Sequence, residues 1–184
     1  MIITITGKPC SGKGTVSKLF CKKYNFEYMC TGDMFREFAK QFGYSSVLEF
    51  QQNYKNIEEI DNLVDNRTAE IGRTRTNENI VIDSRLAWNF APNSFKVFID
   101  VSWEEAGKRL MSANRANETA NSIKQASKDL ETRWKVENER YKKIYNTNNL
   151  DLTNYDYVIS STDLTPEQVV EKIYKEYKKF MQNA

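Results

Sequence analysis

The sequence predicts an α/β protein with a single domain over residues 1–184: a three-layer sandwich in which a five-stranded parallel sheet carries helices on both faces. Short runs rich in Ile and Val alternate along the chain with longer segments whose apolar residues recur at helical spacing. This is the order of a parallel sheet with helical crossovers. A glycine turn also joins the first strand to the first helix, and ligands of such folds bind at the carboxyl ends of the strands.

The first strand, residues 1–6, is short, apolar and β-branched, and a helix over about 12–24 follows it. The glycine-rich turn between them has the pattern of a phosphate loop. Gly7 and Gly12 let backbone N–H groups surround phosphate oxygens, and Lys13 reaches the terminal phosphates. A surface glycine turn in an unrelated α/β protein is the alternative. The residues expected to bind the nucleotide are Gly7, Lys8, Pro9, Cys10, Ser11, Gly12, Lys13, Gly14 and Thr15.

The hydroxyl that follows the loop lysine stands one place later than in the strict phosphate-loop pattern, at Thr15. The resulting Gly-Lys-Gly-Thr ending resembles the nucleoside monophosphate kinases, which include adenylate and cytidylate kinases. This resemblance implies a P-loop NTPase fold, ATP as the phosphoryl donor, and Mg²⁺ held by Thr15.

The second strand, near 27–30, leads into a helix that opens with Thr31-Gly32-Asp33-Met34-Phe35-Arg36. Thr31 and Asp33 are residue types that cap helices, which is the structural interpretation. The segment also resembles the T-G-D-M-[LF]-R segment of the same kinases. That resemblance implies that Thr31, Gly32, Asp33 and Arg36 bind the acceptor, with Arg36 gripping its phosphate.

Residues of about 33–78 are polar and largely helical, with a weak apolar stripe, and we expect them to project from the sheet. They fit the acceptor-binding flap of the kinase family. Asp61, Asp65 and Arg67 resemble an I-D-x-x-x-D segment of archaeal-type cytidylate kinases. Solvated helix charges explain the same residues equally well.

The third strand is predicted over 79–85 and ends in an acid and a base, Asp83 and Arg85. An acid at the end of a strand beside a phosphate loop orders magnesium or its waters, and a guanidinium grips a phosphate with two hydrogen bonds. A salt bridge at the strand end is the alternative. Arg85-Leu86-Ala87-Trp88 resembles the archaeal-type cytidylate kinases, which implies that Trp88 binds substrate. Leu86 departs from the Asp of bacterial-type enzymes.

The fourth strand covers 95–100, and Ser102 with Glu105 predicts the start of the next helix. We expect Arg109 and Arg115 to contact the ATP. Residues of about 111–128 are small and polar, which predicts a lid that closes over the phosphates and excludes water.

A long helix is expected over about 123–145, with Ile123, Leu130, Trp134, Tyr141 and Tyr145 on its apolar face. Arg133, Glu137 and Arg140 share a neighbouring stripe, which is also the pattern of an intrahelical run of ion pairs. The spacing resembles cytidylate kinases, and so does the run from Arg140 to Tyr145. This resemblance implies that Arg133 and Arg140 neutralise phosphate charge while Glu137 positions them or contacts the acceptor.

The last strand is predicted over 155–160, and Thr165-Pro166 begins the final helix. The lysines of that helix are its solvated face. The balanced net charge of +2 indicates no nucleic-acid or membrane partner, and no apolar run approaches the length of a membrane span. With no histidine and three scattered cysteines, His-based catalysis and the common zinc sites are excluded. We expect a cytoplasmic monomer with reduced thiols that acts on small nucleotides.

The resemblance covers nearly the whole chain and implies transfer of the ATP γ-phosphoryl group to CMP or dCMP. Lys13, Arg85, Arg133 and Arg140 would spread the charge of the transition state, and no general base is needed for an ionised phosphate acceptor. Two alternatives stay open. One is a small-molecule kinase for AMP, shikimate or a sugar acid, and the other is a nucleotide-gated ATP-binding protein without kinase activity.

Overall fold

The computed structural model describes residues 1–45, 49–50, 53, 57–112 and 122–183. Its central sheet has the strand order β2-β3-β1-β4-β5, and every neighbouring pair is parallel. The strands are β1 (Ile2–Gly7), β2 (Glu27–Cys30), β3 (Ile80–Asp83), β4 (Phe95–Asp100) and β5 (Tyr157–Ser160). The predicted five-stranded parallel sheet is confirmed. Because all strands run the same way, their carboxyl ends meet at one edge.

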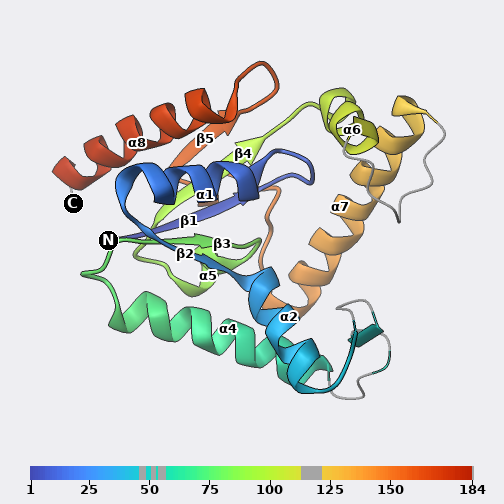
Figure 1. Cartoon of the computed structure of the whole chain (residues 1–184), viewed down its shortest axis with the longest axis horizontal. Coiled ribbons are helices and arrows are strands. Elements are labelled where there is room, and N and C mark those ends of the chain that lie inside the picture. The colour runs from blue at the N-terminus through green and yellow to red at the C-terminus, as the bar shows by residue number, and fades with distance from the viewer. Residues whose placement is uncertain (46–48, 51–52, 54–56, 113–121, 184) are drawn as a thin grey trace.

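Helices cover both faces of the sheet (Figure 1). The helices are α1 (Lys13–Tyr24), α2 (Thr31–Gln41), α4 (Ile57–Thr74), α5 (Ala87–Phe90), α6 (Trp103–Ser112), α7 (Ile123–Tyr145) and α8 (Pro166–Asn183), with a short 3₁₀ helix at Leu152–Asn154. Alternation along β1 assigns the faces: Ile3 and Ile5 pack with α1 and α8, whereas Ile2 packs with α2 and α4.

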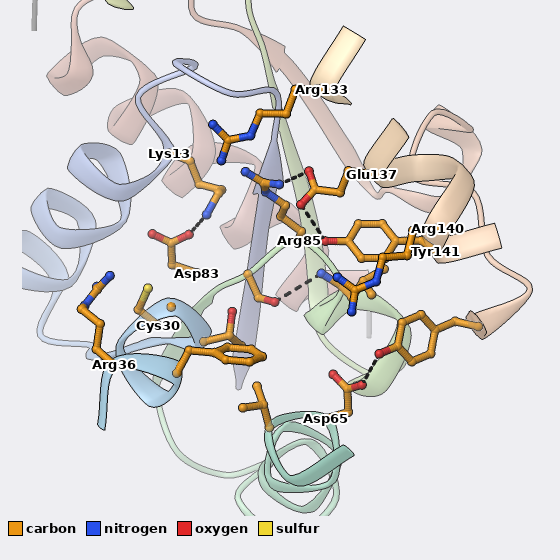
Figure 2. A pocket seen from close by; sticks show the side chains of 17 residues that line it. Lys13, Cys30, Arg36, Asp65, Asp83, Arg85, Arg133, Glu137, Arg140 and Tyr141 are labelled. Carbon is orange, nitrogen blue, oxygen red and sulfur yellow. Dashed lines mark hydrogen bonds and ion pairs between the residues drawn. The ribbon is translucent and has the colours of Figure 1, made fainter. Parts of the chain in front are cut away.

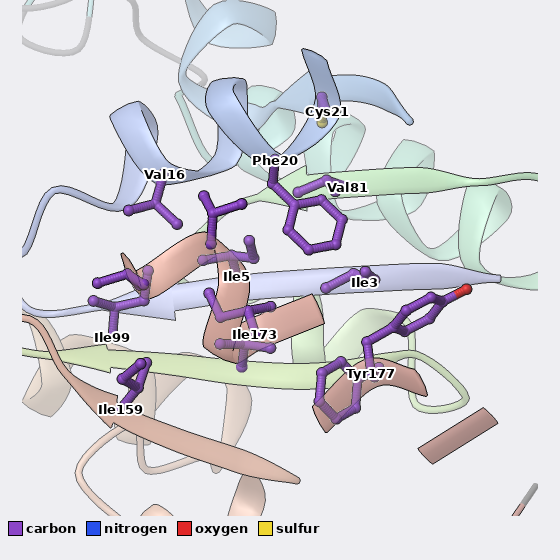
Figure 3. Packing of buried hydrophobic residues seen from close by; sticks show 14 residues of the cluster. Ile3, Ile5, Val16, Phe20, Cys21, Val81, Ile99, Ile159, Ile173 and Tyr177 are labelled. Atoms are coloured by element: carbon purple, nitrogen blue, oxygen red, sulfur yellow. The ribbon is translucent and has the colours of Figure 1, made fainter. Parts of the chain in front are cut away.

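The larger core lies between the sheet and the pair α1 and α8 (Figure 3). Phe20 of α1 and Ile173 of α8 are both fully buried there, over Ile3 and Ile5. Strands covered on both faces have to be apolar along their whole length, and all six residues of β1 are buried. This rigid layer fixes the starting point of the phosphate loop.

The segment α4 lies on the sheet and does not project from it, which corrects our expectation for this part of the chain. Val64 and Ile71 of α4 are buried against Ile80 and Ile82 of β3. A Cβ at Gly72 would stand 2.8 Å from the Ala91 side chain, so the glycine allows α4 to approach the segment after α5 closely. The few apolar residues of α4 are sufficient to bury one side of this helix because α4 approaches the segment after α5 closely.

Both ends of the predicted lid, about 111–128, are helical. Residues 111–112 belong to α6 and residues 123–128 belong to α7, while 113–121 lie outside the described residues. Ser122 caps α7 by accepting a hydrogen bond from the backbone N–H of Gln125, and Ala126 is buried against α6. Small residues in this stretch therefore serve helix packing.

The last strand begins at Tyr157, two residues later than predicted. The Asp156 carboxylate accepts a hydrogen bond from the backbone N–H of Lys96 at 2.8 Å, and its own N–H donates to the Lys96 carbonyl at 2.9 Å. The Asp156 side chain thus replaces one of the backbone acceptors that would otherwise pair this segment with β4. Among the ranges described here, no helix has the length and apolarity to cross a bilayer.

Candidate functional site

The phosphate loop connects β1 to α1 in a conformation that only glycine permits at two positions. A Cβ at Gly7 would stand 2.4 Å from the carbonyl oxygen of Ile99, and Gly12 has a φ of +84°. Gly12 caps α1 without any side-chain hydrogen bond, so the N–H groups of the first helical turn are left for a ligand. The loop surrounds a cavity of about 330 Å³, which residues 7–15 line.

Lys8 fastens the loop to the end of β4. Its ammonium lies 2.6 Å from an Asp100 carboxylate oxygen, 3.3 Å from the Val101 carbonyl oxygen and 4.8 Å from the centre of a Trp103 ring. The loop is therefore held from outside as well as by its own turn.

Lys13 and Asp83 form an ion pair at the junction of the loop and β3. The Tyr28 hydroxyl donates to the other Asp83 oxygen at 3.1 Å, and Asp83 is only 3% exposed. Burial lowers the pKa of the Lys13 ammonium to about 8, and the positive charge of Arg85 acts in the same direction. Asp83 is thus in a salt bridge at the strand end, as the structural alternative expected, and its partner is Lys13.

Arg85 instead pairs with Glu137 of α7. Glu137 also accepts a hydrogen bond from the Tyr141 hydroxyl at 3.0 Å, one turn further along the same helix. Burial lowers the pKa of Arg85 below its ordinary value, and the nearby Arg133 lowers it further. Glu137 of α7 therefore links this helix to the segment that follows β3 and orients the Arg85 guanidinium.

A second cavity, of about 470 Å³, opens beside the phosphate loop between α2, α4 and α7 (Figure 2). The predicted site residues in its wall are Lys13, Thr31, Gly32, Arg36, Asp83, Arg85, Arg133, Glu137 and Arg140. The two cavities share four residues, namely Lys13, Asp83, Arg85 and Arg133. In Figure 2 the guanidinium groups of Arg85 and Arg133 lie near Lys13 at this shared wall, and the Lys13 ammonium points to Asp83.

The other end of the larger cavity has a different chemistry. Asp65 of α4 lies there, away from Lys13 (Figure 2), and the Tyr145 hydroxyl donates to its carboxylate at 2.7 Å. Val64 and Phe35 add apolar surface to the wall. One end thus suits an anion, and the other suits a flat, partly apolar group that carries hydrogen-bond donors.

Four predicted residues, Asp33, Trp88, Arg109 and Arg115, lie outside the walls of the two cavities or outside the described part of the chain. Asp33 is exposed and accepts a hydrogen bond at 3.1 Å from Nε of Arg36, so it orients that arginine. Trp88 is buried and donates to Asn149, because the single turn of α5 directs its indole into the core. Arg115 lies among the residues that the structure does not describe.

Arg109 of α6 contacts the phosphate loop from outside the two cavities. Its guanidinium donates to the carbonyl oxygens of Cys10 and Ser161, at 3.3 and 2.7 Å, and is held by Glu105 at 3.0 Å. It lines a third cavity, of about 220 Å³, together with Ser11, Gly12 and residues at the start of α8.

The capping interpretation of Thr31 and Asp33 is wrong. The helix α2 starts at Thr31 itself, its cap residue is Cys30, and no side chain supplies a capping hydrogen bond. The reason is that β2 runs directly into α2 without a connecting loop, and Thr31 and Gly32, the first residues of α2, line the larger cavity.

Sequence reasoning assigned no role at the site to Tyr28, Cys30 and Tyr141. Tyr141 stands four residues after Glu137, and this spacing could have associated it with the acid. Tyr28 and Asp83 are far apart in the sequence and meet because β2 and β3 pair in register. No local signal indicates that contact.

Thr15 and Asp83 both face the phosphate-loop cavity and offer the oxygen ligands that Mg²⁺ prefers. Within the described ranges there is no group of three or more His, Cys, Asp or Glu side chains placed to bind a metal ion. A magnesium ion that takes its remaining ligands from phosphates and water fits such a pair, since this ion keeps several waters when it binds.

Comparisons with known proteins bear on the family and the fold of this chain. The family model described as "Cytidylate kinase-like family" matches residues 2–163. The chain is 36% identical to a cytidylate kinase of Methanocaldococcus jannaschii over 171 residues, which are 92% of this chain and 93% of the relative. It superposes on a shikimate kinase of Bacteroides thetaiotaomicron with a TM-score of 0.63, at 16% identity and covering 99% and 98% of the two chains.

A further relative is an S-adenosylmethionine-dependent nucleotide dehydratase of Lacinutrix mariniflava, 33% identical over 177 residues. The match covers 96% of this chain but only 36% of that protein. The similarity to the shikimate kinase is evidence for the fold alone. The family match over most of the chain and the archaeal relative together place the protein in the cytidylate kinase-like family, as an ATP-dependent phosphotransferase.

Proposed function

We propose that the protein transfers the γ-phosphoryl group of ATP to the phosphate of CMP or dCMP and releases ADP and the nucleoside diphosphate. The observation that carries this proposal is the wall of Lys13, Asp83, Arg85 and Arg133 that the two cavities share. A donor phosphate in one cavity and an acceptor phosphate in the other would meet at that wall. Phosphoryl transfer needs such positioning and positive charge more than any other catalytic aid.

The chemistry follows from the charges. An acceptor phosphate oxygen attacks the γ-phosphorus in line, the bond between that phosphorus and the β–γ bridging oxygen breaks, and ADP leaves. Lys13, Arg85 and Arg133 balance the charge that develops on the transferring group, while Arg140 and Arg36 line the acceptor side. The acceptor is already ionised near neutral pH, so no residue has to remove a proton.

An acceptor with a hydroxyl group, such as shikimate or a sugar acid, fits less well because it needs a carboxylate base. Asp83 is committed to Lys13 and Tyr28, and Asp33 points to Arg36. Mg²⁺ held by Thr15, with Asp83 beside it, would neutralise charge on the donor phosphates. The third cavity, beside Arg109, is the space next to the loop for the remainder of the donor nucleotide.

A comparison of candidate phosphoryl acceptors tests this function directly. ADP release is coupled to an NADH-linked assay with ATP and each of CMP, dCMP, UMP, AMP and shikimate in turn. We expect turnover that depends on the monophosphate and is fastest with CMP or dCMP. ATP hydrolysis that no acceptor changes would support the nucleotide-gated binding protein instead.

The far end of the acceptor cavity favours a base with an exocyclic amino group, because the Asp65 carboxylate accepts hydrogen bonds and is oriented by Tyr145. We expect Asp65→Asn to lower kcat/KM for CMP about a hundredfold, while kcat/KM for UMP changes little, since sites built to hydrogen-bond a substrate group discriminate strongly. Glu70→Gln, at an exposed position of the same helix, is the matched control. An equal loss with CMP and UMP would refute base reading by Asp65.

The pKa of Lys13 makes a prediction about pH. Because burial lowers that pKa to about 8, the free enzyme loses the loop cation as the pH rises past this value. We expect kcat/KM for ATP to fall above about pH 8, since kcat/KM reports the ionisation of the free enzyme. In Lys13→Arg the fall should disappear because a guanidinium stays charged. Rates measured with ATP and CMP both well below their KM values test this, and a profile that is flat through the alkaline range would contradict it.

A further inference from the structure

We propose that Asn149 is a positioning residue that sets Arg85 against α7, and this inference rests on the proposed phosphoryl transfer. Asn149 follows α7 in the sequence and is completely buried, although its side chain is polar. A buried side-chain amide needs hydrogen-bond partners for both its nitrogen and its oxygen. Its Nδ2 donates to the carbonyl oxygen of Arg85 at 3.0 Å, and its Oδ1 accepts from the Trp88 indole at 2.9 Å.

The main chain around Arg85 is held on the opposite side by β1. The Ser84 N–H donates to the Ile5 carbonyl at 3.2 Å, and the Thr6 hydroxyl donates to the Ser84 carbonyl at 3.0 Å. With the Asn149 bond added, the peptide units on both sides of the Arg85 Cα are fixed. The guanidinium can therefore depart from its position only by changing its side-chain rotamer, which the ion pair with Glu137 opposes.

Asn149 is in turn tied to the helix that carries Glu137. Its backbone N–H donates to Oδ1 of Asn138 at 2.9 Å, and Nδ2 of Asn138 donates to Oδ1 of Asn148 at 3.0 Å. Asn138 is 1% exposed and directly follows Glu137 in α7. The rotation of α7 about its axis is thus fixed at the level where Glu137 meets Arg85. One buried amide joins the two elements that supply the shared cationic wall.

Phosphoryl transfer depends on this placement, because displacing a charged group by about 1 Å costs about a hundredfold in rate. The substitution Asn149→Asp retains an acceptor for Trp88 and replaces the donor to Arg85 by an oxygen that repels its carbonyl. We expect kcat to fall about 10- to 100-fold while KM for ATP changes little. Asn149→Ser, whose hydroxyl is too short to replace the amide, should lower kcat in the same way without adding a negative charge.

Tyr155→Phe is the matched control, since the Tyr155 hydroxyl donates to the Asn149 carbonyl at 3.4 Å and belongs to the same buried cluster without contacting Arg85. Its melting temperature should fall while its kcat stays within about threefold, as expected for a purely structural contact. The decisive measurement repeats Asn149→Asp in an Arg85→Ala background. If Asn149 acts through Arg85, the second substitution adds less than about a twofold loss there.

A full additional loss in the Arg85→Ala background, or a kcat for Asn149→Asp and Asn149→Ser equal to that of the parent, would overturn the inference. A measurement without acceptor separates this result from a failure of the proposed function. The NMR signal of the Arg85 Nε–H, assigned by Arg85→Lys, should be sharp in the parent and in Tyr155→Phe and broadened or shifted in Asn149→Asp. An unchanged signal refutes the positioning role even if no monophosphate is a substrate.

Discussion

We expect Lys13→Ala to lower kcat by about a thousandfold, because it removes the one ammonium that faces both the donor and the acceptor cavity among the described residues. Preorganised positive charge is the main device of phosphoryl transfer, and the neighbouring guanidinium groups cannot move into its place. The measurement is the steady-state rate of ADP release with saturating ATP and CMP. Lys22→Ala, an exposed lysine in the last turn of the same helix, should leave the rate unchanged.

The stability of Lys13→Ala needs its own control, because the substitution leaves the Asp83 carboxylate buried without its cation. We expect a lower melting temperature, since an uncompensated buried charge destabilises the fold. In Lys13→Ala/Asp83→Asn the melting temperature should recover while kcat remains low. If turnover recovered together with stability, the loss in the single variant would be a folding defect, and the catalytic role of Lys13 would be withdrawn.

Arg133→Ala is the second large effect, a fall in kcat of about a thousandfold with every acceptor, because arginines that stabilise phosphoryl transfer contribute on this scale. Arg133 lines both cavities from α7, and its side chain lies at the surface, so the fold should tolerate the change. Thermal unfolding should therefore be nearly unchanged. This separates Arg133 from Arg85, which is half-buried and paired with Glu137.

The controls for Arg133 lie on the same helix. Lys135→Ala removes an exposed cation that pairs with Glu131 at 2.7 Å, and it should leave kcat at the parent value. Arg133→Lys should recover only part of the activity, because an ammonium lacks the planar pair of donors that matches a phosphate. Parent-like rates in Arg133→Ala would mean that the shared wall works without this guanidinium.

The kinship with shikimate kinases concerns the fold and leaves the acceptor to be decided by the site. The same sheet order and phosphate loop can serve acceptors that present a hydroxyl or a phosphate. What distinguishes them here is the charge in the larger cavity. Four arginines line its wall, and Asp83 is engaged by Lys13 and Tyr28, which is the composition expected for a phosphate acceptor.

The sequence alone determined the order of strands and helices, the phosphate loop and most of the cationic residues, because these depend on local signals. Alternating apolar runs specify strands, and Gly7 and Gly12 specify a turn that other residues cannot adopt. The helix around Arg133 was predicted with its observed bounds, 123–145, since its cap and periodicity are contained in the segment itself.

Only the tertiary structure decided which partners these residues have. Glu137 pairs with Arg85 from outside its own helix, Trp88 turns into the core, and Asn149 binds the main chain of Arg85. The physical reason is that such contacts join segments more than 50 residues apart, as in the Trp88–Asn149 bond with its separation of 61. Their geometry follows from strand register and helix packing, which no local pattern encodes.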